Sequence, residues 1–371
     1  MWHPEYQFPE YLKEATHQEK CDYYCHGFLV EHAQLKKSKD DLNFTLFKSN
    51  QYQIVNLVGP TGVGKTELAK SVIKKVFQSA KEDNLNKGTP AVYVEVPVYG
   101  GSIFDWKGLY LRVLDSMNAP PDKLSRAMKL PQSRMAGRGY SERLRTEDQI
   151  RRHLEARIID FGVKILIFDE IQHIFKFTAK NAEKSLDILK SLANITKCQI
   201  VLIGTYESLR NIAWSGQLSR RTENIHFHRY DWMDKKDRMD FMKAYNGLLS
   251  HIPFEISNDL VTDSAILKIY HMCCGCFGIL KQTIEKSLDK HRTPRVLTLD
   301  DINASALSRK ERIQIAREIQ EGEEFFEDGS DEELDLLLGI KKEKSLSKGA
   351  NTLPKSKTRV GSRNPKRDKV G

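Results

Sequence analysis

A glycine-rich segment, GPTGVGKT, runs from Gly59 to Thr66 and constrains the fold of this 371-residue chain more than any other feature. It matches the pattern GxxxxGK[ST], a loop that follows a strand and precedes a helix. The glycines let the backbone N–H groups converge on a phosphate, and the N-terminus of the following helix adds positive charge. Lys65 is expected to reach the β- and γ-phosphates of ATP, and Thr66 to offer its hydroxyl to Mg²⁺. All eight residues are expected to bind the nucleotide: Gly59, Pro60, Thr61, Gly62, Val63, Gly64, Lys65 and Thr66.

Two acidic residues, Asp169 and Glu170, follow the apolar run Val163–Phe168. A continuous apolar run of this kind is typical of a parallel strand buried on both faces. Asp169 is expected to hold Mg²⁺, and Glu170 to polarise the water that attacks the γ-phosphate. Alone, two acids at a strand end are more often simply solvated. Their occurrence together with the phosphate loop favours the catalytic interpretation.

Short apolar runs alternate with helical periodicity from Gln53 onward. Apolar residues recur at helical spacing from Leu68 to Ala80. Thr146 and Gln149 have the form of a capping box, and Gly162 is placed to end the helix that follows. The alternation predicts an α/β fold with a parallel sheet flanked by helices. The expected strands are Ile54–Val58, Ala91–Val98, Val163–Phe168, Gln199–Ile203 and one containing Ile225 and Phe227; further helices are expected near Gln18–Leu35 and Ala182–Ile195.

The same patterns predict four segments. Residues 1–50 form an N-terminal extension, residues 51–230 the nucleotide-binding core, residues 231–320 a helical lid, and residues 321–371 a tail without regular structure. The net charge is +9, and the segment from residue 339 to residue 371 carries eleven Lys or Arg and two acids. Residues 318–338 carry ten acids and no base. An acidic block and a basic tail therefore follow a mildly basic body, a pattern that suits contact with a polyanion.

Three further positions near the core have two interpretations each. Thr205 follows the strand expected at Gln199–Ile203, and either contacts the γ-phosphate or the lytic water, or is an ordinary turn residue. Arg220 and Arg221 are either arginine fingers, which supply charge to a neighbour's γ-phosphate, or a solvated basic pair. The sequence leaves both questions open.

The segment from residue 123 to residue 152 holds nine basic residues and three acidic ones. Together with Lys107 before it, this segment either lines a groove for the phosphate backbone of DNA or forms a solvated loop. Lys107, Arg134 and Arg138 are the predicted DNA contacts.

No stretch approaches eighteen consecutive apolar residues, so no membrane span is expected. The N-terminus lacks the pattern of a secretory signal. Six cysteines without that signal are expected to be reduced thiols in a cytoplasmic protein. Their spacing makes a zinc site the less favoured interpretation.

Two runs of residues in the predicted core resemble motifs of a known family. The run IFDEIQHI from Ile167 to Ile174 resembles the IDEIQHL signature of the TnsC and TniB regulators of DNA transposition, and VLIGT from Val201 to Thr205 resembles their LIGT segment. The resemblance covers about residues 50–285. It implies a AAA+ fold, and a bacterial protein that assembles in the ATP state as a ring or helical filament on double-stranded DNA. It also implies links to a target selector such as TniQ and to a TnsB-like, possibly also TnsA-like, transposase.

The resemblance carries roles onto particular residues. Lys65, Thr66, Asp169, Glu170 and Thr205 take the matching roles in ATP binding and hydrolysis, and hydrolysis takes the assembly apart. Arg220 or Arg221 becomes the finger that reaches the neighbouring subunit. Lys281, in the run Gly278-Ile279-Leu280-Lys281, is the nearest match to the nucleotide-sensing residue of the lid. Three other functions stay open: an initiator or loader of the Orc/Cdc6 type, a P-loop kinase for a small molecule, and a scaffold that binds ATP with little turnover.

Overall fold

The computed structural model describes residues 9–12, 14–49, 53–82, 88–101, 103–117, 146–176, 179–208, 222–253, 255–290, 296–326 and 330–340. The chain divides into two compact units, Met1–Phe326 and Glu327–Gly371. The first unit contains the sheet, its flanking helices and the helical lid.

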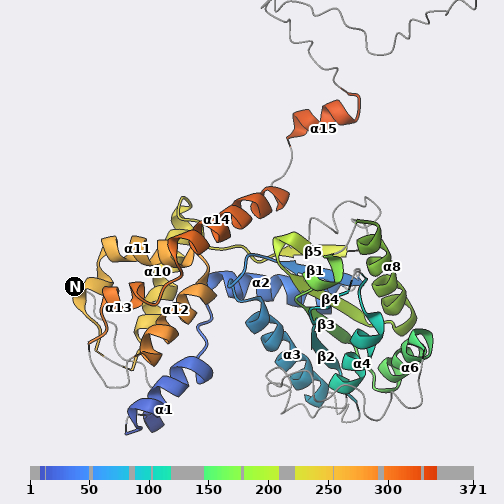
Figure 1. Cartoon of the computed structure of the whole chain (residues 1–371), viewed down its shortest axis with the longest axis horizontal. Coiled ribbons are helices and arrows are strands. Elements are labelled where there is room, and N and C mark those ends of the chain that lie inside the picture. Colours follow the sequence, from blue (N-terminus) through green and yellow to red (C-terminus); the bar gives the residue numbers. More distant parts are fainter. Residues whose placement is uncertain are drawn as a thin grey trace, which may run out of the picture. The chain divides into compact units, whose positions relative to one another are not determined.

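Five parallel strands form one sheet in the order β2-β3-β4-β1-β5 (Figure 1). The chain enters at β1 inside the sheet, crosses to the edge strand β2, and returns through β3 and β4. This order places the carboxyl ends of β3, β4 and β1 side by side, and ligands of open α/β sheets bind at that edge. The strands are β1 (Ile54–Val58), β2 (Ala91–Glu95), β3 (Ile165–Asp169), β4 (Gln199–Gly204) and β5 (Thr222–His226).

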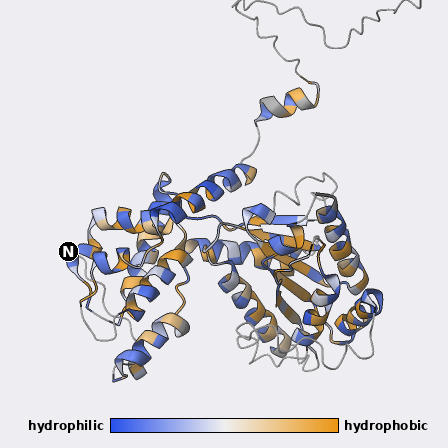
Figure 2. Ribbon diagram, in the orientation of Figure 1, coloured by the Kyte–Doolittle hydropathy of each residue, from blue (hydrophilic) through white to orange (hydrophobic). Residues whose placement is uncertain are grey.

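Helices cover both faces of the sheet, so successive strand residues are buried against different layers. On β3, Leu166 and Phe168 pack with α4, α6 and α8, whereas Ile165 and Ile167 pack with α2 and α3. Figure 2 shows the resulting apolar strands between amphipathic helices. The helices are α2 (Ala33–Phe44), α3 (Lys65–Glu82), α4 (Trp106–Met117), α6 (Glu147–Asp160), α7 (Gln172–Phe175) and α8 (Ala179–Thr196).

Local sequence signals explain several boundaries. The capping box predicted at Thr146 and Gln149 is confirmed, with both reciprocal hydrogen bonds present at the start of α6. Gly162 ends this helix with φ of 63°, in the left-handed region that glycine favours. The strand predicted at Ala91–Val98 is shorter than expected. It ends at Glu95, and Val98 is 69% exposed, because the chain leaves the sheet towards α4.

The N-terminal extension differs from the single helix predicted near Gln18–Leu35. The structure has α1 (His17–Asp22), a π-helical turn at Tyr23–Gly27, an extended segment, and then α2. Phe28 is extended, with φ of −112° and ψ of 124°, and His32 caps α2 through its side chain. The break brings this segment across both the core and the lid. Cys21 and Tyr24 are buried in the apolar core of the lid.

The lid consists of α10 (Lys235–Leu249), α11 (Asp263–Cys273), α12 (Phe277–Asp289), α13 (Leu299–Asn303) and α14 (Arg309–Glu323). Among the described residues, no single helix is long and apolar enough to cross a membrane, and only the pair α11 and α12, bent by 102°, meets that test together. The apolar residues of this pair, including Ile269 and Leu280, are buried in the core of the lid.

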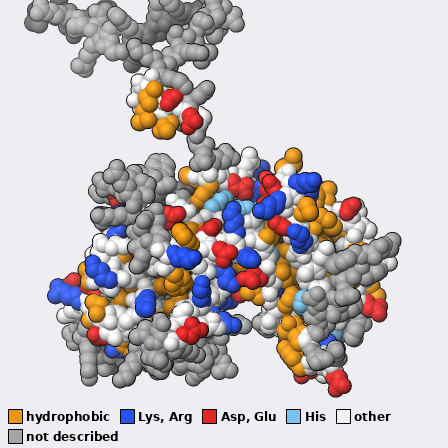
Figure 3. Space-filling model, turned by 180° about the vertical axis from the view of Figure 1, so that it is seen from behind, with side chains coloured by type: hydrophobic (Ala, Val, Ile, Leu, Met, Phe, Trp, Pro, Cys, Tyr) orange, Lys and Arg blue, Asp and Glu red, His pale blue; other side chains and the backbone are white. Residues whose placement is uncertain are grey.

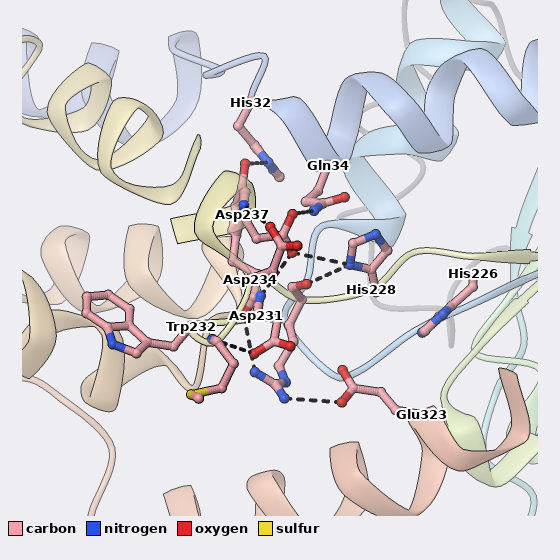
Figure 4. A network of polar contacts seen from close by, with 12 residues as sticks. His32, Gln34, His226, His228, Asp231, Trp232, Asp234, Asp237 and Glu323 are labelled. Carbon is pink, nitrogen blue, oxygen red and sulfur yellow. Dashed lines mark hydrogen bonds and ion pairs between the residues drawn. The ribbon is translucent and has the colours of Figure 1, made fainter. Parts of the chain in front are cut away.

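The linker from Phe227 to Asp234 joins β5 to the lid and is held by a polar network (Figure 4). The carboxylate of Asp237 accepts hydrogen bonds from the Gln34 side chain at 2.9 Å and from the Asp231 backbone N–H at 3.0 Å. Arg229 donates to Glu323 at 3.1 Å and to the Tyr270 hydroxyl at 2.7 Å. The linker is therefore bonded to α10, α11 and α14, and Asp237 of α10 is bonded in turn to α2.

In the second unit, the structure describes one helix, α15 (Asp331–Leu337). The tail expected to lack regular structure therefore contains this short helix. Its leucines include Leu334 and Leu336, which are 54% and 42% exposed.

His32 gives a pH-dependent contribution to stability. Its Nδ1 lies 3.0 Å from the Tyr230 hydroxyl and accepts from the Leu35 N–H, and burial lowers its pKa to about 3. The unfolded chain binds a proton at this side chain near pH 6.5 and the folded chain does not. The unfolding free energy should therefore fall as the pH is lowered from 6.5, by about 1.4 kcal/mol per pH unit. Urea unfolding of the wild-type protein and of His32→Gln between pH 6.5 and 4.5 tests this. A difference in free energy between the two proteins that stays constant over this range contradicts it.

Candidate functional site

The phosphate loop has the backbone shape that its sequence predicts. Gly62 and Gly64 adopt φ of 75° and 118°, a region that side chains other than glycine rarely occupy. Lys65 is the first residue of α3, so the N-terminus of that helix follows the loop directly. The unpaired N–H groups of a helix N-terminus attract anions. The loop and helix therefore have the geometry of a phosphate-binding site.

The Lys65 side chain turns back to the loop, where its ammonium group donates to the Gly59 and Pro60 carbonyls, each at 2.8 Å. Burial lowers the pKa of this side chain to about 8, and the negative charges of Asp169 and Glu170 partly oppose that shift. An anionic phosphate near the ammonium group would stabilise its charged form. The position suits the predicted contact with the β- and γ-phosphates.

Asp169 ends β3 and meets the phosphate loop directly. The Thr66 hydroxyl donates to Asp169 Oδ2 at 2.9 Å, and the Glu170 backbone N–H donates to Oδ1 at 2.9 Å. The Tyr93 hydroxyl, from the neighbouring strand β2, donates to Oδ2 at 2.7 Å. Three donors thus orient one carboxylate, which is 2% exposed.

Glu170 follows Asp169 with φ of 58°, which is uncommon for a residue with a side chain. Such conformations cluster at functional sites, where the surrounding structure enforces them. The adjacent Ile171 N–H donates to the Ile203 carbonyl at 3.0 Å, which holds the turn against β4. The Glu170 carboxylate accepts a hydrogen bond from the Gln172 side chain.

Thr205 lies directly after β4 and faces the same cavity as Lys65 and Glu170. Its carbonyl accepts from the Ser208 hydroxyl at 2.6 Å, which closes a turn at this strand end. Gly204, just before it, leaves no room for a side chain, because an added Cβ would lie 2.6 Å from Ile171 and from Ser208. The end of β4 is therefore packed closely against the turn that carries Glu170.

A cavity of about 430 Å³ is lined by the phosphate loop, Glu170 and Thr205. Its size is in the range of small-molecule and cofactor sites. The N-terminal extension and the lid complete its walls, so the core alone does not form the site. The extension contributes Cys25, Leu29, Val30, His32 and Leu35, and the lid contributes Phe277, Gly278, Lys281, Gln282 and Glu285.

The lid touches the phosphate loop at the start of α12. The Ile279 N–H donates to the Gly62 carbonyl at 3.1 Å. A Cβ added at Gly278 would lie 2.4 Å from that same carbonyl oxygen. The two backbones approach so closely that Gly278 cannot be replaced without displacement of one of them. The conformation of the loop is therefore coupled to the position of α12.

Lys281, predicted as a lid residue that senses the nucleotide, lines the cavity. Its ammonium group donates to the Phe28 carbonyl at 2.8 Å and lies 3.4 Å from Glu285. The structure therefore brings Lys281 to the site but directs it to the N-terminal extension. Its contact with a nucleotide stays a prediction.

Four predicted residues, Arg134, Arg138, Arg220 and Arg221, lie outside the described residues. Lys107 lies in the first turn of α4, beyond the edge strand β2. The six cysteines are free thiols, and the described residues contain no group of His, Cys, Asp and Glu that could hold a metal ion by itself.

Sequence reasoning missed Tyr93, Gln172 and the cavity residues of the N-terminal extension. The contact of Tyr93 with Asp169 could have been predicted from the expected parallel strands. Tyr93 lies two residues before the end of β2, on the same face as Ile167, and parallel pairing brings it near Asp169. Burial, with the charge of Asp169, raises the pKa of Tyr93, so its hydroxyl remains a donor.

The oxygen donors fit Mg²⁺, which prefers carboxylate, hydroxyl and water ligands. The Thr66 hydroxyl and Asp169 Oδ2 are 2.9 Å apart beside the cavity. These two side chains are the ones that would hold the ion together with the phosphates of a nucleotide.

Tyr93→Phe should weaken this metal site, because it removes one of the donors that orient Asp169. Loss of such a supporting contact typically reduces metal affinity or activity about 10- to 100-fold. The Mg²⁺ concentration that half-saturates nucleotide binding should therefore rise. Tyr245→Phe is the matched control, since that buried hydroxyl donates one hydrogen bond to Leu260 in the lid. Equal Mg²⁺ dependence in both variants contradicts the role assigned to Tyr93.

The match to one family model agrees with this geometry. Residues 49–212 match the family model of the AAA domain. Similar solved structures include the Walker-type ATPase of Pyrococcus abyssi, at 15% identity and a TM-score of 0.46, covering 78% of this chain and 74% of that one. They also include the ORC1 protein of Aeropyrum pernix in complex with DNA, at 15% identity and a TM-score of 0.48, covering 82% and 69%. No curated protein matches the chain. The chain thus has the P-loop AAA+ fold predicted for it, with its AAA domain at residues 49–212.

Proposed function

We propose that this protein is an ATPase that regulates DNA transposition. In the ATP state it assembles on double-stranded DNA and links a target selector such as TniQ to a TnsB-like transposase, possibly with a TnsA-like partner. ATP hydrolysis then takes the assembly apart. The observation that carries the ATPase part is the hydrogen bond from Thr66 to Asp169, beside a cavity that is lined by Thr66, Lys65 and Glu170. The IFDEIQHI and VLIGT runs support the transposition part.

Each side chain of the site has a defined task in this proposal. ATP with Mg²⁺ supplies the reactive phosphoryl group and a cation that neutralises charge. Lys65 binds phosphate oxygens, while Thr66 and Asp169 hold the metal. Glu170 orients the attacking water and accepts its proton. Thr205 offers a hydroxyl to the γ-phosphate or to that water.

The switch follows from contacts that exist only in the assembled state. Arg220 or Arg221 of one subunit would form charge-assisted hydrogen bonds with the γ-phosphate bound to its neighbour. ATP then favours assembly, because it binds the assembled state more tightly than the free subunit. Hydrolysis removes that difference.

DNA binding is proposed through Lys107, Arg134 and Arg138, by contacts with the phosphate backbone. Figure 3 shows one face of the molecule, where the described Lys and Arg side chains are interspersed with Asp and Glu. That face carries no continuous basic stripe among its described residues. The proposal therefore depends on the basic segment between α4 and α6, and binding should weaken steeply with added salt.

Lys65→Ala should lower ATP hydrolysis about 100-fold or more, because a cation at the phosphates is lost. Phosphate release measured with saturating Mg²⁺ tests this. Lys74→Ala is the matched control, since Lys74 is an exposed lysine on the same helix. Turnover that is equal in the two variants shows that the site has been assigned wrongly.

Images of the protein with duplex DNA and a non-hydrolysable ATP analogue test the assembly. We expect ring or filament particles that require both ligands and that are lost in Arg220→Ala or Arg221→Ala. An arginine variant mixed with Lys65→Ala should regain part of the ATP hydrolysis, because each subunit supplies what the other lacks. If no particles form at low salt, the proposed role in transposition is wrong, whereas the ATPase proposal is unaffected.

A further inference from the structure

We propose that Gln172 is a positioning residue for ATP hydrolysis, which holds the Glu170 carboxylate in the orientation needed to activate water. This inference rests on the proposed ATPase function. It starts from the contact between the Gln172 amide nitrogen and Glu170 Oε2, and from the place of both side chains in the wall of the cavity.

The direction of the Gln172 amide is fixed by chemistry. A carboxylate can only accept, so the amide nitrogen must be the atom that faces Glu170. The amide oxygen is then left buried, without a donor among the described residues. The contact with Glu170 is therefore the one that determines how this side chain lies among the described residues.

The backbone that carries Gln172 is rigidly supported. Ile171 and Ile174 are fully buried, and the Ile171 N–H is bonded to the Ile203 carbonyl of β4 at 3.0 Å. Gln172 begins the one-turn helix α7 immediately after the left-handed residue Glu170. The fold thus places the amide two residues beyond the carboxylate, at a turn that cannot shift without disturbing the sheet.

The hydrogen bond engages only one oxygen of Glu170. Its other carboxylate oxygen, Oε1, has no donor among the described residues, so it is available to accept a proton from water. A glutamate side chain has three rotatable bonds, and an unrestrained carboxylate would spend much of its time in other orientations. A fixed amide donor keeps the carboxylate in one orientation for more of the time, as hydrogen bonds from surrounding residues do in other sites.

Gln172→Met tests the inference, because methionine has a similar length and no donor. The single-turnover rate of ATP hydrolysis should fall about 10- to 100-fold, while the affinity for a non-hydrolysable ATP analogue stays within about twofold. In a Glu170→Gln background the same substitution should cause no further loss, because Gln172 acts through Glu170.

Gln34→Met is the matched control. The buried Gln34 amide also donates to a carboxylate, that of Asp237, but it lies in the linker network outside the cavity wall. This variant should lose stability and keep the single-turnover rate. Comparison of Gln172→Met with Gln34→Met separates the general effect of losing an amide–carboxylate hydrogen bond from the effect of losing the bond to Glu170.

Two results overturn the inference. One is a wild-type rate in Gln172→Met when Glu170→Gln is inactive. The other is an equal further loss in the Glu170→Gln background, which indicates a merely structural role. A wild-type rate in Glu170→Gln itself would instead overturn the role proposed for Glu170, and with it the basis of this inference.

Discussion

The hydrogen bond from Thr66 to Asp169 joins two segments that lie 103 residues apart in the chain. It exists because the strand order places the carboxyl ends of β1 and β3 on either side of β4. A parallel sheet directs all its strands to the same edge, so the loop after β1 and the acid at the end of β3 meet without any special connection. Tyr93 from β2 and Thr205 after β4 reach the same edge. The chemistry of the site is therefore a consequence of the topology.

The sheet alone does not complete the site. The extension before β1 and the lid after β5 supply the remaining walls of the cavity, and they pack against each other through Cys21 and Tyr24 in the core of the lid. His32 illustrates this arrangement, because it caps α2, contacts Tyr230 in the linker, and lies 4.3 Å from the Phe277 ring by centroid distance. A ligand in the cavity thus contacts three parts of the chain together.

The sequence predicted the central parts of the fold because their signals are local. Apolar runs marked the positions of the strands, and the phosphate loop and the Thr146 capping box marked the starts of two helices. The predictions failed where tertiary contacts determine the conformation of the backbone. The π-helical turn at Tyr23–Gly27 and the extended Phe28 have no local pattern, and they depend on packing against the lid. Tyr93 was missed because its role depends on Asp169, which only the pairing of the strands brings close. Gln172 was missed because only the turn after β3 shows that its side chain faces Glu170.

The contacts of the linker between β5 and α10 couple the lid to the phosphate loop. Phe227 at its start bonds to the Val58 carbonyl at 2.8 Å, and its own carbonyl oxygen leaves no space for a side chain at Gly59. The lid returns to the same loop at Gly62, and the linker is bonded to Asp237 and Glu323 along its length. The linker thus contacts one end of the phosphate loop, at Gly59, and the lid contacts the other part, at Gly62. A rigid rotation of the lid would break one of these two contacts or deform the loop. The position of the lid and the shape of the loop are therefore coupled.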